Sequence, residues 1–234
     1  ARVGRVGCGS AAPLALALRQ EWLARRVAAQ AGRLEGEIQL LPTFVRPTDV
    51  CWDIGANAGT YTLALSRLAS RVFAFEPVPH NIEILETVKK RVGLNNVSIQ
   101  RLAIGDVDGS GRMTIPIDGF YGGYYLAALD DKGPLSVSTA SIDGLIAQGL
   151  PQPDFIKCDV EGAEARVING ARSLIARRHP IWLLETFEDE VLSLMQSLGY
   201  VAHVHVGNGN IERVQARAIT HRNYLFLPTT GATR

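Results

Sequence analysis

A short apolar run, a glycine turn and a helical pattern at residues 50–62 constrain the fold most strongly. The sequence there reads VCWDIGANAGTYT, in which the apolar run ends on Asp53 and the turn runs from Gly55 to Gly59. Glycines let the backbone approach a ligand closely, and the first turn of a helix carries free N–H donors. The stretch therefore predicts a strand, a tight turn and a helix that together bind a nucleotide-like ligand.

The acid at the end of this strand narrows the class of ligand. A carboxylate at Asp53 repels a diphosphate, whereas it attracts a ligand that carries an ammonium group. The turn also lacks the full GxGxxG spacing of dinucleotide-binding enzymes. Both features favour S-adenosylmethionine over NAD, and an NAD-dependent oxidoreductase is kept as an alternative.

Apolar runs alternate with helical patterns along most of the chain. The expected parallel strands are residues 50–52, 72–75, 97–99, 155–158 and 181–184. Residues 200–206 and 224–227 are expected to form a terminal antiparallel pair, joined through a turn at residues 207–210. This alternation predicts an α/β fold with a mostly parallel sheet, an antiparallel C-terminal hairpin and helices on both faces.

Composition sets the expected domains and surroundings. Residues 1–36 are interpreted as a basic, helical leader, and residues 37–234 as one α/β domain. No stretch reaches the ~18 apolar residues of a membrane span. The three scattered cysteines are typical of reduced thiols in a cytoplasmic protein. A formal net charge of +1 argues against nucleic acid as the partner.

Acids directly follow the first, second, fourth and fifth of the predicted parallel strands: Asp53, Glu76, Asp159 and Glu185. Ligands of open α/β sheets bind outside the carboxyl ends of the strands, so the chemistry is expected where these acids lie. Glu76 stands 21 positions after Gly55, a spacing typical of a carboxylate that binds ribose hydroxyls.

Four segments together resemble a known family. They read DIGANAGTYT, AFEPVPHN, RLAIGDVDG and IKCDVEGAEARVINGA. Over about residues 37–227 they resemble the FkbM-type family of S-adenosylmethionine-dependent methyltransferases. The resemblance implies the class I methyltransferase fold, which is Rossmann-like and has a seven-stranded, mostly parallel sheet. The family typically methylates hydroxyls of sugars, polyketides and other secondary metabolites.

The resemblance also implies roles for individual residues of the cofactor site. A loop around the methionine end of the cofactor would be formed by Asp53, Gly55, Asn57 and Gly59. Glu76 would bind the ribose, with Pro77 and Val78 near the adenine, and with Leu102 and Ala103 closing over the adenine ring.

An alcohol acceptor is too weakly acidic to ionise at neutral pH, so a base or a metal must assist it. The resemblance places Asp159 near the sulfonium and the acceptor. The candidate bases are Asp159, Glu161 and Glu185. Asp159 and Glu185 can instead bind Mg²⁺ or another divalent cation through oxygen ligands. Base catalysis and metal assistance both stay open at this point.

The acceptor side is the least defined part of the sequence. Tyr121 and Tyr124 lie in a glycine-hinged FYGGYY loop that suits a lid over a sugar or ring, and His221 precedes the last strand. We expect a small-molecule hydroxyl acceptor, and a homodimer stays open. The alternatives are an RNA or base methyltransferase, for which no NPPY-type motif is found, and a non-catalytic S-adenosylmethionine-binding scaffold.

Overall fold

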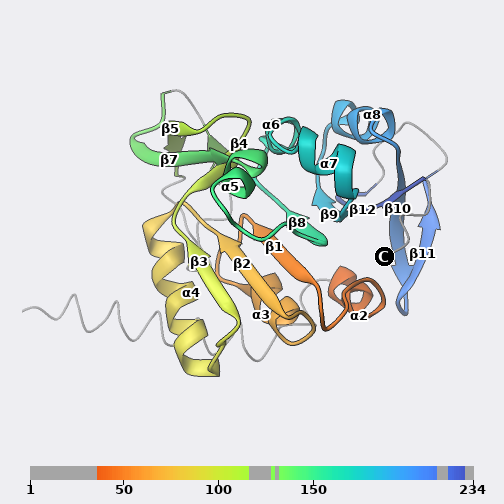
Figure 1. Cartoon of the computed structure of the whole chain (residues 1–234), viewed down its shortest axis with the longest axis horizontal. Helices are drawn as coiled ribbons and strands as arrows, with labels where there is room; N and C mark the ends of the chain where they lie inside the picture. Colours follow the sequence, from red (N-terminus) through yellow and green to blue (C-terminus); the bar gives the residue numbers. More distant parts are fainter. Residues whose placement is uncertain (1–35, 116–127, 130–131, 215–220, 230–234) are drawn as a thin grey trace, which may run out of the picture.

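The computed structural model describes residues 36–115, 128–129, 132–214 and 221–229. The leader up to residue 35, Tyr121 and Tyr124 lie outside these ranges, and their predicted roles stay predictions. The described part forms two β-sheets flanked by helices (Figure 1).

The main sheet contains eight strands in the described residues. Their spatial order is β11 (Asn210–Arg213), β10 (Tyr200–Gly207), β12 (Asn223–Pro228), β9 (Ile181–Glu185), β8 (Phe155–Cys158), β1 (Val50–Ile54), β2 (Arg71–Phe75) and β3 (Val97–Gln100). The strands from β9 to β3 are parallel to one another, and β12, β10 and β11 pair antiparallel. Strand order reverses between β1 and β8, which is where such sheets bind ligands.

This arrangement confirms the expected α/β fold and adds one strand to it. The seven expected strands are present, and β12 lies between β9 and β10. The turn at residues 207–210 leads from β10 into the additional edge strand β11. It therefore does not join the terminal pair directly, because the chain first forms this extra hairpin.

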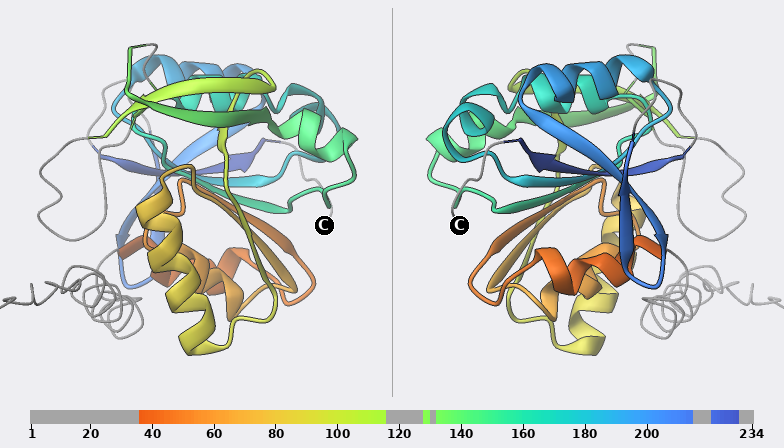
Figure 2. Two further views of the ribbon diagram at one scale, coloured as in Figure 1. Left: turned by 90° about the vertical axis from the view of Figure 1, so that its left-hand side faces the viewer. Right: turned by 90° about the vertical axis from the view of Figure 1, so that its right-hand side faces the viewer.

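Helices cover both faces of the main sheet (Figures 1 and 2). On one face lie η1 (Gly36–Leu40), α2 (Leu41–Phe44), α3 (Thr60–Ser66) and α4 (Pro79–Val92). On the other lie α5 (Ile142–Ala147), α6 (Glu164–Asn169), α7 (Arg172–Arg178) and α8 (Asp189–Ser197). Two separate helices, α6 and α7, follow β8, with Gly170 packed against the backbone of Gly105 at the break between them.

Alternation along the strands assigns side chains to two separate cores. Trp52 and Ile54 of β1 pack into the core beneath α6, α7 and α8. Cys51, one position away, packs toward α3 on the opposite face. Each fully buried large apolar side chain contributes about 1.5–3 kcal/mol to folding. Cys51 and Cys158 are buried, and in the described part of the chain neither forms a disulfide.

A second, smaller sheet stands beside the carboxyl ends of the main one. Its order is β4 (Ala103–Gly105), β7 (Leu135–Ser141), β5 (Gly109–Thr114) and β6 (Ala128–Leu129). The sheet brings Ala103 and Met113 to the pocket described below.

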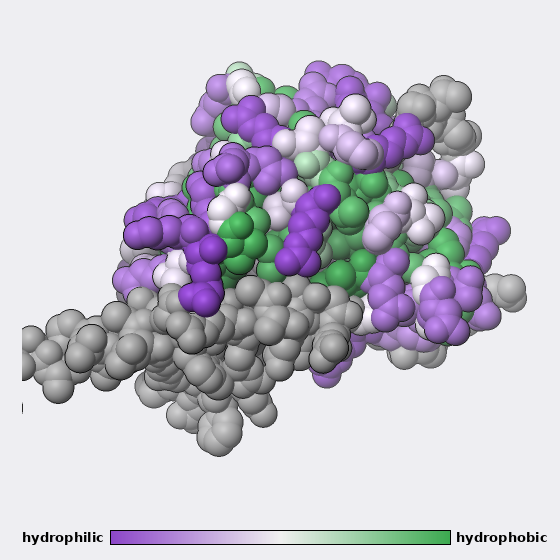
Figure 3. All heavy atoms as spheres, turned by 90° about the horizontal axis from the view of Figure 1, so that it is seen from below, coloured by the Kyte–Doolittle hydropathy of each residue, from purple (hydrophilic) through white to green (hydrophobic). Residues whose placement is uncertain are grey.

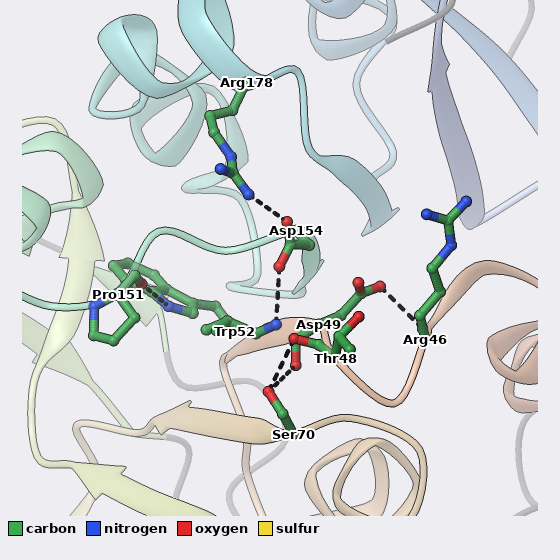
Figure 4. Close-up of polar contacts among 9 residues, drawn as sticks. Arg46, Thr48, Asp49, Trp52, Ser70, Pro151, Asp154 and Arg178 are labelled. Atoms are coloured by element: carbon green, nitrogen blue, oxygen red, sulfur yellow. Dashed lines mark hydrogen bonds and ion pairs between the residues drawn. The ribbon is translucent and has the colours of Figure 1, made fainter. Parts of the chain in front are cut away.

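Polar contacts fix the opposite ends of the central strands (Figure 4). Asp154 accepts a hydrogen bond from the backbone N–H of Val50 at 3.0 Å and pairs with Arg178 at 2.6 Å. The indole N–H of Trp52 donates to the carbonyl of Pro151 at 3.2 Å. These contacts hold β1 and β8 in register, so that their carboxyl ends emerge side by side.

The outer surface over α2, α3 and α4 mixes polar residues with an apolar area (Figure 3). Within the described ranges, every helix is too short or too polar to cross a membrane.

Candidate functional site

A pocket opens at the carboxyl ends of β1, β2 and β8, at the reversal of strand order. Its empty volume, including the space open to solvent, is about 620 Å³. Seven of the nine residues predicted to bind a cofactor line it: Gly55, Asn57, Glu76, Pro77, Val78, Leu102 and Ala103. Of the predicted catalytic residues, Asp159 and Glu161 line it too. The sequence did not single out Ile54, Phe75, Asn81, Ile104, Met113, Val160 and Ala163, which complete the lining.

Gly55 allows β1 and β8 to come together at the floor of this pocket. Its φ is +78°, and a Cβ there would lie 1.8 Å from the carbonyl oxygen of Asp159. The backbone N–H of Asp159 in turn donates to the carbonyl of Ile54 at 3.0 Å. No side chain fits at this position, so the glycine is required by both conformation and space.

Glu76 closes the turn from the neighbouring strand. Its carboxylate accepts hydrogen bonds from the backbone N–H of Asn57 at 2.8 Å and of Val78 at 2.9 Å. The side-chain amide of Asn81 donates to it at 3.3 Å. Glu76 is only 4% exposed, so its carboxylate is held in place at the pocket wall.

Burial controls the ionisation of this carboxyl group. It raises the pKa of Glu76 from 4.5 to about 7, and the charge of Asp53 also raises it, while the hydrogen bonds from Val78, Asn57 and Asn81 lower it. The group therefore changes charge near neutral pH.

Asn57, one of the residues that line the pocket, has an unused acceptor. It adopts a positive φ of 50°, and its buried side-chain oxygen Oδ1 has no hydrogen-bond partner among the described residues. A buried acceptor without a donor is costly, and a ligand that supplies an N–H or O–H group would satisfy it.

Asp53 and Gly59, the other two predicted cofactor residues, lie behind the turn. Asp53 is 1% exposed and accepts a hydrogen bond from the hydroxyl of Thr62 at 2.5 Å. At Gly59, with a φ of +93°, a Cβ would lie 2.4 Å from the side chain of Leu85. Both residues support the turn and α3, and neither is among the residues that line the pocket. Their predicted contact with a cofactor stays a prediction.

Lys157 is a site residue that the sequence reasoning missed. Its side chain is 2% exposed, and its Nζ lies 3.0 Å from Oδ2 of Asp159. The same ammonium lies 4.8 Å from the ring centroid of Tyr61, and Lys157 stands opposite Asp53 in the sheet register. A lysine inside an otherwise apolar strand was the available signal, because a buried lysine needs a charged partner.

Glu161 and Glu164 follow β8 and differ in environment. Glu161 lines the pocket with a positive φ of 54°, a strained conformation for a residue with a side chain. The pKa of Glu161 is raised to about 7, mainly by burial and also by the charges of Asp159 and Glu164. The charges of Lys157 and Arg222 act in the opposite direction and lower it. Glu164 is buried and accepts the backbone N–H groups of Val160 and Gly162, which gives it a structural role.

A rim beside the pocket is formed by the end of β9 and the start of β12. Glu185 is half-buried there and stands opposite Asn223. The backbone N–H of Thr186 donates to the carbonyl of Arg222 at 2.9 Å, and the guanidinium carbon of Arg222 lies 4.8 Å from the ring centroid of Phe187. His221 is exposed, with its ring 6.5 Å from that of Tyr224. The sequence reasoning missed Phe187 and Arg222.

The acids at this site do not fit a divalent cation. Asp159, one of the two predicted ligands, is paired with the ammonium of Lys157. In the described ranges, no three His, Cys, Asp or Glu side chains gather in an arrangement that could hold a metal ion. A Mg²⁺ or Ca²⁺ site in a protein usually needs more oxygen ligands than two carboxylates supply.

Comparison with known proteins agrees with this geometry. A family model described as "Methyltransferase FkbM domain" matches residues 53–202. The hexuronic acid methyltransferase AglP of Haloferax volcanii is 34% identical over 150 residues, which are 58% of this chain and 57% of that protein. The 31-O-demethyl-FK506 methyltransferase FkbM of Streptomyces tacrolimicus is 28% identical over 198 residues, covering 67% and 74% of the two chains.

A solved structure gives the same fold. The crystal structure of methyltransferase FkbM from Methylobacillus flagellatus superposes with a TM-score of 0.55 at 18% identity, and the match covers 91% of this chain and 59% of that one. The chain thus spans less than two thirds of the length of this structure and of AglP.

Proposed function

The chain belongs to the FkbM methyltransferase family, and we propose that it transfers the methyl group of S-adenosylmethionine to a hydroxyl of a sugar or secondary-metabolite acceptor. The observation that carries the proposal is the Glu76 carboxylate, which is fixed at the pocket wall by the turn that Gly55 and Asn57 form. Its position suits the two hydroxyls of a ribose, and its pKa of about 7 leaves it ionised above neutral pH.

The remaining pocket residues suit the other parts of this cofactor. Leu102, Ala103 and Met113 give an apolar surface for an adenine ring. The unpartnered Oδ1 of Asn57 can accept a hydrogen bond from the ammonium group of the methionine portion. Asp159 and Glu161 place negative charge on the side where a cationic sulfonium would lie.

S-adenosylmethionine, when bound, supplies an electrophilic methyl group. As the C–O bond to the acceptor forms, the C–S bond breaks, and the acceptor hydroxyl must give up its proton. We assign this proton to the carboxylate of Glu161, while the carboxylate of Asp159 stays paired with the ammonium of Lys157. A base with a pKa near the working pH is the most effective proton acceptor, and that of Glu161 is about 7. The proposed transfer uses no metal, since the acids of the described site do not fit one.

The two relatives and the open rim beside the pocket both support the proposed class of acceptor. Their names give a hexuronic acid and 31-O-demethyl-FK506 as the molecules that these two proteins methylate. An oxygen on a sugar or a polyketide-like scaffold is therefore the acceptor that we propose. Glu185 lies at this rim and is half-buried, so we keep it as a residue that orients the acceptor, together with the exposed His221.

Calorimetric titration with S-adenosylhomocysteine and with NAD tests the cofactor. We expect S-adenosylhomocysteine to bind and NAD to leave the heat signal unchanged; the reverse result would identify a dinucleotide enzyme instead. A labelled-methyl transfer screen over glycosides, sugar nucleotides and RNA then tests the acceptor. Mass spectrometry locates the methyl group, and transfer to RNA alone would contradict the proposed class. Binding of S-adenosylhomocysteine without any transfer would favour a non-catalytic scaffold.

A further inference from the structure

Phe187 and Arg222 form a feature of the rim that the proposed reaction does not use. They are 35 positions apart in the sequence, and the pairing of β12 with β9 brings them together. The hydrogen bond from the N–H of Thr186 to the carbonyl of Arg222 joins the two segments directly beside them. The pairing of β9 with β12 therefore holds Phe187 and Arg222 close together.

In this geometry both residues can still contact a ligand. The guanidinium carbon lies 4.8 Å from the ring centroid of Phe187, which is stacking distance. Stacking occupies a face of the guanidinium, whereas its N–H donors point outward in the plane. Within the described ranges, no carboxylate is ion-paired with Arg222. Phe187 remains 57% exposed, so part of its ring is accessible to a ligand.

The charge of Arg222 also acts on a residue of the pocket. The charge of Arg222 is close enough to lower the pKa of Glu161, which lines the pocket. The pocket side of this edge carries Asp159 and Glu161, and Lys157 is buried and already paired with Asp159. Arg222 therefore supplies a positive charge that an acceptor would meet at the rim.

We propose that Phe187 and Arg222 form an acceptor subsite that binds a sugar ring carrying an acidic group, a carboxylate or a phosphate. The acidic group accepts two hydrogen bonds from the guanidinium, and the apolar face of the ring packs on the exposed part of Phe187. The acceptor is held at the rim by this contact while one of its hydroxyls faces Glu161. The inference rests on the proposed methyl transfer and adds the charge of the acceptor to it.

The test uses the full chain saturated with S-adenosylhomocysteine and three probes titrated by calorimetry. Methyl glucuronide carries a carboxylate, glucose 6-phosphate carries a phosphate, and methyl glucoside is neutral. We expect at least one acidic probe to bind about ten- to a hundredfold more tightly than the glucoside, as expected for a charge-assisted bidentate contact. Whether the carboxylate or the phosphate is preferred decides between the two sources of the acidic group.

Variants assign the preference to these residues. Arg222→Gln is expected to bring the acidic and neutral probes to within about twofold of each other, whereas Phe187→Ala weakens all three probes. Arg177→Gln, which changes an exposed arginine in α7, is the matched control and keeps the preference.

Equal binding of acidic and neutral probes would overturn the subsite. So would a preference that survives Arg222→Gln, or the absence of binding by both acidic probes at millimolar concentration. S-adenosylhomocysteine binding is measured first and separates the two proposals. If it fails, the methyltransferase proposal fails; if it holds while the acidic probes do not bind, only the subsite is wrong.

Discussion

The two halves of the site occupy the same edge of one sheet and are constructed differently. On the β1–β2 side, the polar groups bind each other: Glu76 holds the turn amide of Asn57, and Gly55 leaves no room for a side chain. On the β8–β9–β12 side, Phe187 and Arg222 are exposed and Glu161 holds a strained backbone conformation. The first half is closed by its own hydrogen bonds, and the second is open to a partner.

This difference suits two kinds of ligand, one that is invariant and one that can vary. A half closed by backbone contacts suits one invariant ligand, because its geometry cannot vary without breaking the turn. An open half with exposed side chains can be changed by single substitutions without loss of the fold. The comparison predicts that variants in the first half affect cofactor binding, and that variants in the second affect turnover.

The largest effect is expected from Gly55→Ala, because the new Cβ would overlap the carbonyl oxygen of Asp159 at 1.8 Å. The turn must move, and we expect S-adenosylhomocysteine to bind at least about a thousandfold more weakly, or about 4 kcal/mol. Calorimetric titration measures this. The matched control is Gly93→Ala, where φ is +73° but nothing lies within 4 Å of the added methyl group. It should cost only about 1–2 kcal/mol of stability. Equal effects of the two variants on binding would show that the close approach is unimportant.

Lys157→Met tests the ion pair with Asp159, which lies between the two halves of the site. The substitution removes the ammonium from Asp159 and from its neighbour in register, Asp53. Breaking a buried ion pair costs about 3 kcal/mol or more, to be measured by urea unfolding. Lys90→Met, at an exposed position of α4, should change stability by less than about 0.5 kcal/mol. If Asp159→Asn added to Lys157→Met does not recover part of the loss, the pair is not the source of the stability.

Glu161→Gln should lower turnover but leave cofactor affinity unchanged, which distinguishes the functions of the two halves. It removes the proposed base, so turnover on an acceptor found by the transfer screen should fall about a hundredfold or more. Affinity for S-adenosylhomocysteine should stay within about threefold, since Glu76 and the turn are unchanged. In the unmodified protein, turnover should fall as the pH drops below about 7, where Glu161 becomes protonated. Asp189→Asn, at an exposed acid at the start of α8, is the control. Full activity of Glu161→Gln would move the role of base to Asp159.

A smaller effect is expected from pH on cofactor binding. The pKa of Glu76 is raised to about 7 in the folded protein, so its carboxylate is protonated at pH 6 and ionised at pH 8. Only the ionised form offers both oxygens to the ribose hydroxyls, and affinity for S-adenosylhomocysteine should rise by up to about tenfold between these values. Glu76→Gln should bind more weakly and with little change over the same range. An affinity that falls with rising pH would contradict this role.

The two halves also differ in how far the sequence predicted them. The turn and Glu76 were predictable because their residues lie within a short stretch and their spacing reflects local geometry. Lys157 was not singled out, although a lysine inside an otherwise apolar strand was the signal available for it. Phe187 and Arg222 meet only through the pairing of β9 with β12, and β11 arises because the turn after β10 forms its own hairpin. Contacts between distant segments depend on sheet order, which a periodic pattern does not encode.

Metal removal should have the smallest effect of all. Asp159 is already neutralised by the ammonium of Lys157 at 3.0 Å, so the open half carries its own fixed cation beside the proposed base. We expect turnover to change by less than about twofold after exhaustive treatment with EDTA, and added Mg²⁺ or Mn²⁺ to leave it unchanged. Calorimetric titration of Mn²⁺ into the protein saturated with S-adenosylhomocysteine gives a second readout that needs no acceptor. One equivalent of Mn²⁺ bound by the unmodified protein and lost in Asp159→Asn would restore the site predicted at Asp159 and Glu185, and Lys157 would then compete with the metal rather than replace it.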